Sequence, residues 1–435
     1  MEETRNASPY FNGEDRISSL FSDDKTYSFV MFVDMVFIFR CKDIDIQRLC
    51  VHWENAAFHD SVAVHVNRWC LHAVEYNVED LSLLISQRHN SAYEIPHRLM
   101  SCKSLKKLEI GMFGRGRYAD IILPSSMSLP QLKVMYLNGL SISNAELSKK
   151  LFSSCPVLET LAICDCNIQT DNQRSLTVDS VSLKKFEYSH FHRHLLTHTM
   201  ANIIKLSAPN LEEFSCRSFL TQYFYLRNCS PIPRVDFDMF LEEDVNPETY
   251  SKLPKTETAV YAKRMVKFLG AVCMVKEMRL SSGFLEVLSH APDLLDSKPP
   301  RLCNLYHLIL EMWYTRGCLR AIAYLLKMSP NITELFLESK KSNLAGVGDD
   351  WEAGLSSPGM LSHLNFVQME DVEGCDAEFK LLSFLLKKAK VLEEVVVFFR
   401  SSIGSPDRVR QVALFMDKLK AVPAASSSIK MVFKS

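Results

Sequence analysis

Four histidines stand close together near the middle of the chain, in the segment HFHRHLLTH. They are His190, His192, His194 and His198, and the last two would share one face of a helix because they are four residues apart. Zinc sites use histidines at this spacing. No cysteine or carboxylate stands within the segment to complete a set of ligands. We therefore interpret it as a loop between structural elements and predict no metal site.

Two other short segments contain residue types that could do chemistry. Cys164 and Cys166 form Cys-Asp-Cys, which lacks the Cys-x-x-Cys spacing of metal or redox pairs, so packed thiols are the favoured interpretation. GMFGRGRYAD at 111–120 has three glycines but neither the G-x-G-x-x-G spacing nor a following Gly-Lys-Ser/Thr. A variable loop is favoured there, with Arg115 and Arg117 available at the rim of a binding surface.

The sequence contains no recognisable set of catalytic residues. The G-x-S-x-G and H-E-x-x-H motifs are both missing. Only 14 glycines are spread over 435 residues, which gives little support for nucleotide-binding loops. We therefore predict that the protein is not an enzyme and that it has no catalytic residues, no metal and no cofactor.

The composition is typical of a soluble globular protein, with 47% hydrophobic and 23% charged residues. A formal net charge of -1 gives no electrostatic reason to expect a nucleic-acid or membrane partner. The apolar run FVMFVDMVFIF at 29–39 contains Asp34 and is too short to cross a bilayer, so it predicts a buried helix. Without a recognisable secretory signal, the 13 cysteines indicate reduced thiols in an intracellular protein, cytoplasmic and/or nuclear.

A leucine-rich pattern returns along the chain at nearly constant spacing. In SLKKLEI, Leu105, Leu108 and Ile110 form an L-x-x-L-x-L pattern. Each x-x-L-x-L predicts a short strand whose alternate residues point into a core, and such a strand needs neighbours to cover that core face. Copies of the pattern begin at residues 46, 78, 105, 132, 158, 183, 211, 232, 275, 305, 332, 364 and 392.

The spacing of the copies matches leucine-rich repeats. We therefore predict the α/β class, as a leucine-rich-repeat solenoid (horseshoe-like) of short parallel strands backed by helices and loops. Return helices are predicted in SNAELSKKLFSSCP (143–156), with Ser143 and Glu146 as a capping box, and in CLRAIAYLLKMSP (318–330). A further helix is predicted at 259–272.

Several copies resemble one particular family more closely than leucine-rich repeats in general. SCKSLKKLEI, LFSSCPVLETLAICDC and LSAPNLEEFSC are similar to repeats of the plant F-box/leucine-rich-repeat proteins that often end in an FBD domain. The segment 363–399 resembles the start and middle of that domain, with a Glu373-Gly374 loop before a helix that ends in Ala-x-Val-Leu-Glu-Glu (389–394). The resemblance extends from about residue 13 to the C-terminus.

The resemblance implies an N-terminal F-box, which docks on a Skp1-type adaptor of a cullin-RING ubiquitin ligase. The chain keeps EDRISSL (14–20) and YSFVMFVD (27–34), which flank this domain in the family. Only six residues lie between Leu20 and Tyr27. Because one average helix takes about 11–12 residues, a three-helix domain does not fit there. We therefore expect the F-box to be missing, which argues against binding of the adaptor.

These observations predict three regions. Residues 1–26 are expected to be the disordered flanks of a missing F-box, 27–354 a leucine-rich-repeat solenoid, and 355–435 an FBD-like region that continues it. The resemblance implies a non-enzymatic protein-recognition scaffold, like the substrate receptor of an SCF-type (Skp1-cullin-F-box) ubiquitin ligase. The alternative is an F-box-less variant that binds a target protein without recruiting the ligase, as a competitor, a splice form or an inactive product.

The repeat pattern also predicts where a target protein would bind. Residues that alternate with the core leucines face outward on the concave side, where solenoids usually bind their partners. In the C-terminal repeats they form an acidic strip with aromatic interruptions, which would suit a basic segment of the partner. The candidate residues are Glu277, Arg279, His307, Glu311, Glu334, Phe336, Glu338, Phe366 and Glu370.

Overall fold

The computed structural model shows a chain made of two compact units. The first unit comprises residues 1–211 and 222–230, and the second comprises 212–221 and 231–435. The residues that the structure describes are 10–12, 23–41, 43–53, 60–87, 92–114, 118–191, 202–229, 231–241, 247–290, 301–313, 316–340, 360–400 and 406–434.

The first unit is built on parallel strands that pair in sequence order. Its main strands are β1 (Tyr10–Asn12), β2 (Arg48–Trp53), β3 (Asp80–Gln87), β5 (Lys107–Gly114), β7 (Val134–Asn138), β9 (Thr160–Cys164) and β12 (Lys185–Ser189). Two smaller parallel sheets accompany them. One contains β4 (Tyr93–Glu94), β6 (Ala119–Ile122), β8 (Leu140–Ile142) and β10 (Asn167–Ile168), and the other β11 (Ser175–Asp179), β13 (Ile203–Ser207) and β15 (Tyr223–Arg227).

Helices of the first unit lie mainly near its N-terminal strands. They are α1 (Asp23–Phe39), α2 (Asp60–Glu75), the 3-10 turn η1 (Leu99–Ser101) and α3 (Ala145–Ser153). Helix α3 begins after Asn144, whose side-chain oxygen accepts a hydrogen bond from the backbone N–H of Leu147 at 3.1 Å. The predicted capping box of Ser143 and Glu146 is therefore wrong, because Asn144 is the N-cap.

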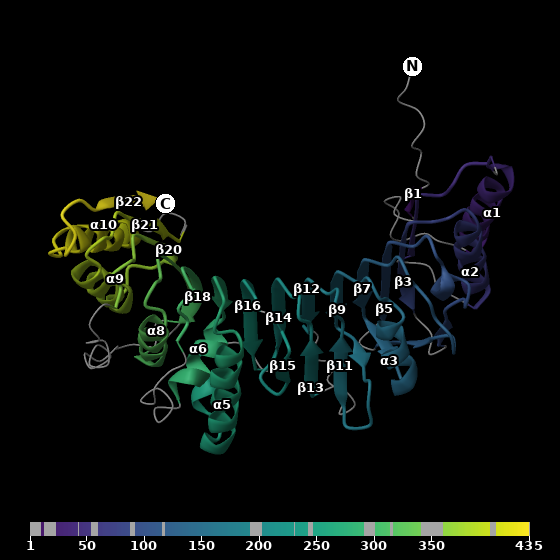
Figure 1. The fold of residues 1–435 in the computed structure, drawn as a ribbon. Coiled ribbons are helices and arrows are strands. Elements are labelled where there is room, and N and C mark those ends of the chain that lie inside the picture. Colours follow the sequence, from purple (N-terminus) through teal and green to yellow (C-terminus); the bar gives the residue numbers. More distant parts are fainter. Residues whose placement is uncertain are drawn as a thin grey trace. The chain divides into compact units, whose positions relative to one another are not determined.

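The second unit repeats strand and helix more regularly. Its parallel strands are β14 (Glu213–Phe219), β16 (Arg234–Phe240), β17 (Glu277–Leu280), β18 (His307–Trp313), β19 (Glu334–Lys340), β20 (Phe366–Val372), β21 (Glu394–Phe399) and β22 (Lys430–Lys434). The helices are α4 (Pro247–Ser251), α5 (Lys255–Ala271), α6 (Ser282–Ser289), α8 (Arg316–Met328), α9 (Asp376–Lys388) and α10 (Pro406–Lys420). In Figure 1 the helices of this unit line one side of its strands.

The leucine pattern accounts for the core of both units. Leu308, Leu335 and Val367 lie opposite one another on β18, β19 and β20 and are completely buried. In the first unit Leu108 and Met135 are paired and buried in the same way. Burying each such side chain contributes about 1.5–3 kcal/mol. The predicted α/β solenoid of parallel strands and the helices predicted at 318–330 and 259–272 are confirmed, the latter two as α8 and α5.

Helix α1 confirms the helix predicted at 29–39, but it is buried on one face only. Val30, Val33 and Phe37 face inward and are buried. The carboxylate of Asp34 accepts a hydrogen bond from the indole N–H of Trp69 in α2 at 2.7 Å. It also forms an ion pair with the guanidinium of Arg68, at 3.1 Å. The prediction of a buried helix therefore holds for one face of α1, and the opposite face is exposed to solvent.

One tight turn in the first unit depends on glycine. Gly139 joins β7 to β8 with a φ of +71°, and an added Cβ would lie 2.0 Å from the carbonyl oxygen of Met112. Its N–H donates to the carbonyl of Cys164 at 3.0 Å, and its carbonyl accepts from the N–H of Ala119 at 2.9 Å. Gly139 therefore allows three consecutive repeats to approach one another at this turn.

We expect Gly139→Ala to destabilise the protein by at least about 1–3 kcal/mol, because the left-handed conformation and the contact with Met112 both oppose a side chain. A matched control is Gly270→Ala in α5, where an added Cβ meets nothing within 4 Å. The control should stabilise its helix by about 0.5–1 kcal/mol. Thermal unfolding followed by circular dichroism compares the two variants, and equal melting temperatures would contradict this account of the turn.

Candidate protein-binding surface

The nine residues predicted for target binding all lie on four neighbouring strands of the second unit, β17 to β20. Their side chains alternate with buried leucine, valine and methionine residues along each strand. Eight of the nine are partly or fully exposed, and Glu311 is buried. The structure therefore brings the whole predicted set together on one strand face of this unit.

The strand register arranges these residues in rows across the four strands. The first row contains Glu277, His307, Glu334 and Phe366, each opposite the next. In the second row Arg279 is opposite Ile309, followed by Phe336 and Gln368. The third row contains Glu311, Glu338 and Glu370.

Three ring side chains contact one another in a row on this surface. The rings of His307 and Phe336 are 4.6 Å apart at an angle of 17°, and those of Phe336 and Phe366 are 5.5 Å apart at 44°. All three rings are partly exposed, as is Ile309 beside them. We call His307, Ile309, Phe336 and Phe366 the aromatic patch. It offers apolar area at the centre of a polar surface, which is the usual anatomy of a protein interface.

A charged cluster lies next to the aromatic patch. The guanidinium of Arg279 donates to Glu311 at 2.8 Å and to Glu338 at 2.9 Å, and Lys340 also pairs with Glu311. Burial alone would raise the pKa of Glu311, but the hydrogen bonds from Lys340 and Arg279 hold that pKa below its ordinary value. Burial opposes the charge of Arg279, and Glu311 and Glu338 nevertheless raise its pKa. Glu311 and Arg279 are therefore ionised and paired at neutral pH.

Other carboxylates of the surface also have partners. Glu277 pairs with Arg234 of β16 at 3.1 Å, and Glu334 lies 3.4 Å from the His307 ring nitrogen. Glu370 accepts a hydrogen bond from Gln368 at 2.7 Å and is exposed. The surface is therefore a mixture of ion pairs and apolar rings, with Glu370 the carboxylate of the third row most open to solvent.

Sequence reasoning missed several residues that share this face. Ile309 and Gln368 belong to the second row, and Asp236 and Asp238 of β16 extend the surface beyond β17. Burial raises the pKa of both aspartates, and for Asp238 the nearby Glu311 adds to the effect. The same alternation in the weaker copy of the repeat that begins at Ile232 would have identified the two aspartates.

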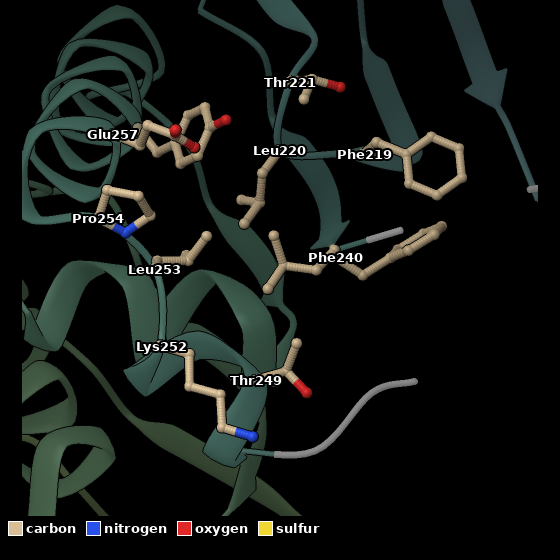
Figure 2. Close-up of a pocket in the computed structure, with 11 residues that line it drawn as sticks. Phe219, Leu220, Thr221, Phe240, Thr249, Lys252, Leu253, Pro254 and Glu257 are labelled. Carbon is tan, nitrogen blue, oxygen red and sulfur yellow. The ribbon is translucent and has the colours of Figure 1, made fainter. Parts of the chain in front are cut away.

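A separate pocket of 370 Å³ lies in the second unit between the ends of β14 and β16 and helices α4 and α5. Figure 2 shows Leu220 and Leu253 directed toward the same space, with Lys252 and Glu257 at its edge. Polar and apolar groups contribute about equally to its lining. The remaining lining residues are Phe219, Thr221, Phe240, Leu241, Thr249, Pro254 and Tyr261.

The structure accounts for the part of the histidine segment that it describes. His190 is completely buried, with one ring nitrogen 3.2 Å from the hydroxyl of Tyr118 and the other 3.6 Å from Asp165. His192, His194 and His198 lie outside the described residues, as do Arg115 and Arg117. Across the described ranges, no three His, Cys, Asp or Glu side chains come together as ligands for a metal ion.

The two cysteines of the Cys-Asp-Cys segment are packed thiols. Cys166 is buried, and burial raises the pKa of both Cys164 and Cys166. None of the 13 cysteines, all of which lie within the described residues, forms a disulfide. In the part of the chain that the structure describes, no helix has the length and apolar character needed to span a membrane.

Comparisons with known proteins show which sequences this chain is similar to. Residues 66–232 match the family model described as FBD-associated F-box protein At5g56370, LRR repeats, and residues 358–397 match the FBD model. The chain is 27% identical to FBD-associated F-box protein At1g66310 of Arabidopsis thaliana over 97% of this chain and 86% of the relative. It is 24% identical to F-box/FBD/LRR-repeat protein At1g78750 of the same plant, over 96% and 85%.

Losing Arg279 should destabilise the protein, because Glu311 is buried and Arg279 is one of its two cationic partners. For Arg279→Met we expect a loss of about 1–3 kcal/mol in the free energy of unfolding. Arg234→Met is the matched control, since Arg234 is exposed and pairs with Glu277 at the surface. The control should cost much less, because water screens an exposed ion pair. Chemical denaturation measures both values, and a larger loss for the control would contradict this description of the cluster.

Proposed function

Because the chain is related to the plant F-box/FBD/leucine-rich-repeat proteins, we propose that it is a non-enzymatic scaffold that binds a target protein. The target would lie on the strand face formed by β17 to β20. The aromatic patch is the observation that carries this proposal. The strand register places its partly exposed rings side by side, where they pack against one another. Little side-chain freedom would therefore be lost when a partner covers them.

The chemistry of the surface indicates what kind of segment would fit. An apolar side chain of the target would cover Phe336 and Phe366, which aromatic-rich interfaces favour. The carboxylates of Glu334 and Glu338 flank Phe336 on the same strand and are partly exposed. A target segment with an apolar residue beside Lys or Arg would therefore match the surface, with the charges guiding orientation and the rings supplying contact area.

The relatives' names suggest the larger assembly. A chain of this kind would act as the substrate-receptor arm of an SCF-type ubiquitin ligase and present its target for ubiquitination. A second candidate is an F-box-less variant that holds the target without recruiting the ligase. The short interval between EDRISSL (14–20) and helix α1 favours this second role, because α1 already begins at Asp23, three residues after Leu20. The junction between Leu20 and Phe21 lies outside the described residues.

The regional division predicted from the sequence completes the proposal. Residues 1–26 would be the flanks of the missing F-box, 27–354 would form the target-binding repeats, and the FBD-like region 355–435 would continue them. The parallel pairing of β20 with β19, and of β21 and β22 beyond it, supports this continuation. Thirteen cysteines without a disulfide support an intracellular location, in the cytoplasm or nucleus.

We expect the purified chain not to bind a recombinant Skp1-type adaptor, because the sequence between Leu20 and α1 has no room for a three-helix domain. A matched control chain carries the corresponding N-terminal segment of the relative At1g66310 inserted between Leu20 and Phe21, and this control should bind. Biolayer interferometry measures both. Binding of the unmodified chain would contradict the second candidate role and support the ligase-receptor role instead.

Peptide selection tests the binding surface without knowledge of the target. A phage library of random peptides panned on the immobilised chain should enrich peptides in which an apolar residue neighbours Lys or Arg. The double variant Glu334→Lys, Glu338→Lys should reduce binding of the enriched peptides by at least about tenfold, which corresponds to about 1.4 kcal/mol.

Asp417→Lys is the control for the charge change, since Asp417 is exposed on helix α10 of the same unit. It should leave binding of the peptides unchanged. Equal binding by the double variant and the original chain would overturn the assignment of this surface. Circular dichroism spectra of all three chains verify that they are folded.

A further inference from the structure

The outer face of α1 is an apolar surface with no explanation in the target-binding role. Five large side chains there are exposed: Met31 by 42%, Phe32 by 60%, Met35 by 42%, Ile38 by 62% and Phe39 by 76%. We call these five residues the α1 stripe. They occupy a helix in the first unit, whereas the proposed target surface lies on strands of the second unit.

The spacing of the α1 stripe is that of a helix that packs against another helix. Phe32, Met35 and Phe39 are separated by three and then four residues, which is the spacing of a coiled-coil seam. Met31 and Ile38 flank this seam on one side. Exposed apolar residues that occur singly need no explanation, but a contiguous stripe indicates a surface that another molecule covers.

The inner contacts of α1 hold this stripe in solvent. The carboxylate of Asp34 accepts hydrogen bonds from Trp69 at 2.7 Å and from Arg68 at 3.1 Å, and lies 3.0 Å from a ring nitrogen of His65. Three partners on α2 therefore fix the rotation of α1 about its axis. Turning the stripe inward would break these contacts and expose Val30 and Val33 instead. The exposure is thus a built feature of the first unit.

The charge of the helix restricts what could cover it. Between residues 28 and 39 the only charged residue is Asp34, and α2 engages its carboxylate. The stripe therefore offers neither a cation for an acidic partner nor an anion for a basic one. It also lacks the Lys and Arg residues with which amphipathic helices bind anionic lipid surfaces. Its complement is an uncharged apolar helix face of the same length.

We infer that the α1 stripe is the interface of a two-fold dimer with a second copy of this chain. An identical copy supplies a face of matching length and chemistry, and a two-fold interface uses the same patch on both partners. The five residues of the stripe carry no charge, and a net charge of -1 per chain gives little repulsion between copies. Because about two helical turns per copy form a small interface, we expect concentration-dependent association.

A charge-complementation experiment on the full chain tests this inference. Met35 is the middle residue of the stripe, so it lies nearest its own counterpart in a two-fold pair. Sedimentation velocity should show the unmodified chain moving from monomer to dimer as its concentration rises. Met35→Glu and Met35→Lys should each associate at least about tenfold more weakly, since each places two like charges at the axis. An equimolar mixture of the two variants should recover the dimer.

A control variant and three contrary outcomes make the test decisive. Val409→Glu changes a side chain that is 68% exposed on helix α10 and should dimerise like the unmodified chain. An unmodified chain that remains monomeric at all concentrations would overturn the inference. So would a mixture of the Met35 variants that stays monomeric, or a monomer that binds phosphatidylcholine vesicles through the stripe. Thermal unfolding of each variant verifies that its fold is intact.

Discussion

Each repeat in this protein depends on the next one to cover its row of buried side chains. A single short strand presents alternate apolar residues that it cannot remove from water alone. Parallel pairing places Leu308, Leu335 and Val367 side by side, so every repeat completes the core of its neighbour. The same register that builds the core also places the outward residues in rows, and the aromatic patch is a product of that register.

The paired charges on the strand face serve a related purpose. A strand face needs polar residues to remain soluble, yet carboxylates in adjacent positions would repel one another. Arg279 and Lys340 relieve this repulsion around Glu311, and Arg234 does so for Glu277. With the charges paired internally, the rings of His307, Phe336 and Phe366 become the part of the surface with the most contact area to offer a partner.

The repeats, the strand positions and the outward row of residues on each strand could be predicted from the sequence, because their alternation is a local pattern. The pattern did not indicate that Glu311 would be buried. Long-range partners could not be predicted in this way. Nothing local indicates that Arg279 reaches Glu338, which is 59 residues away, or that Asp34 meets Trp69, which is 35 residues away. The exposed face of the helix at 29–39 could not be predicted for the same reason, since hydrophobicity indicates a helix but not which of its faces another element covers. Asn144 capped α3 in place of Ser143, a one-residue difference that spacing alone does not resolve.

The contact between Arg279 and Glu338 has a consequence for how the second unit unfolds. In a simple linear array, each repeat interacts only with its immediate neighbours, and unfolding can begin at either end and advance one repeat at a time. Arg279 on β17 contacts Glu338 on β19, so it adds a coupling between repeats that are not adjacent. We therefore expect the repeats of β17, β18 and β19 to unfold more cooperatively than a linear array with contacts between adjacent repeats alone.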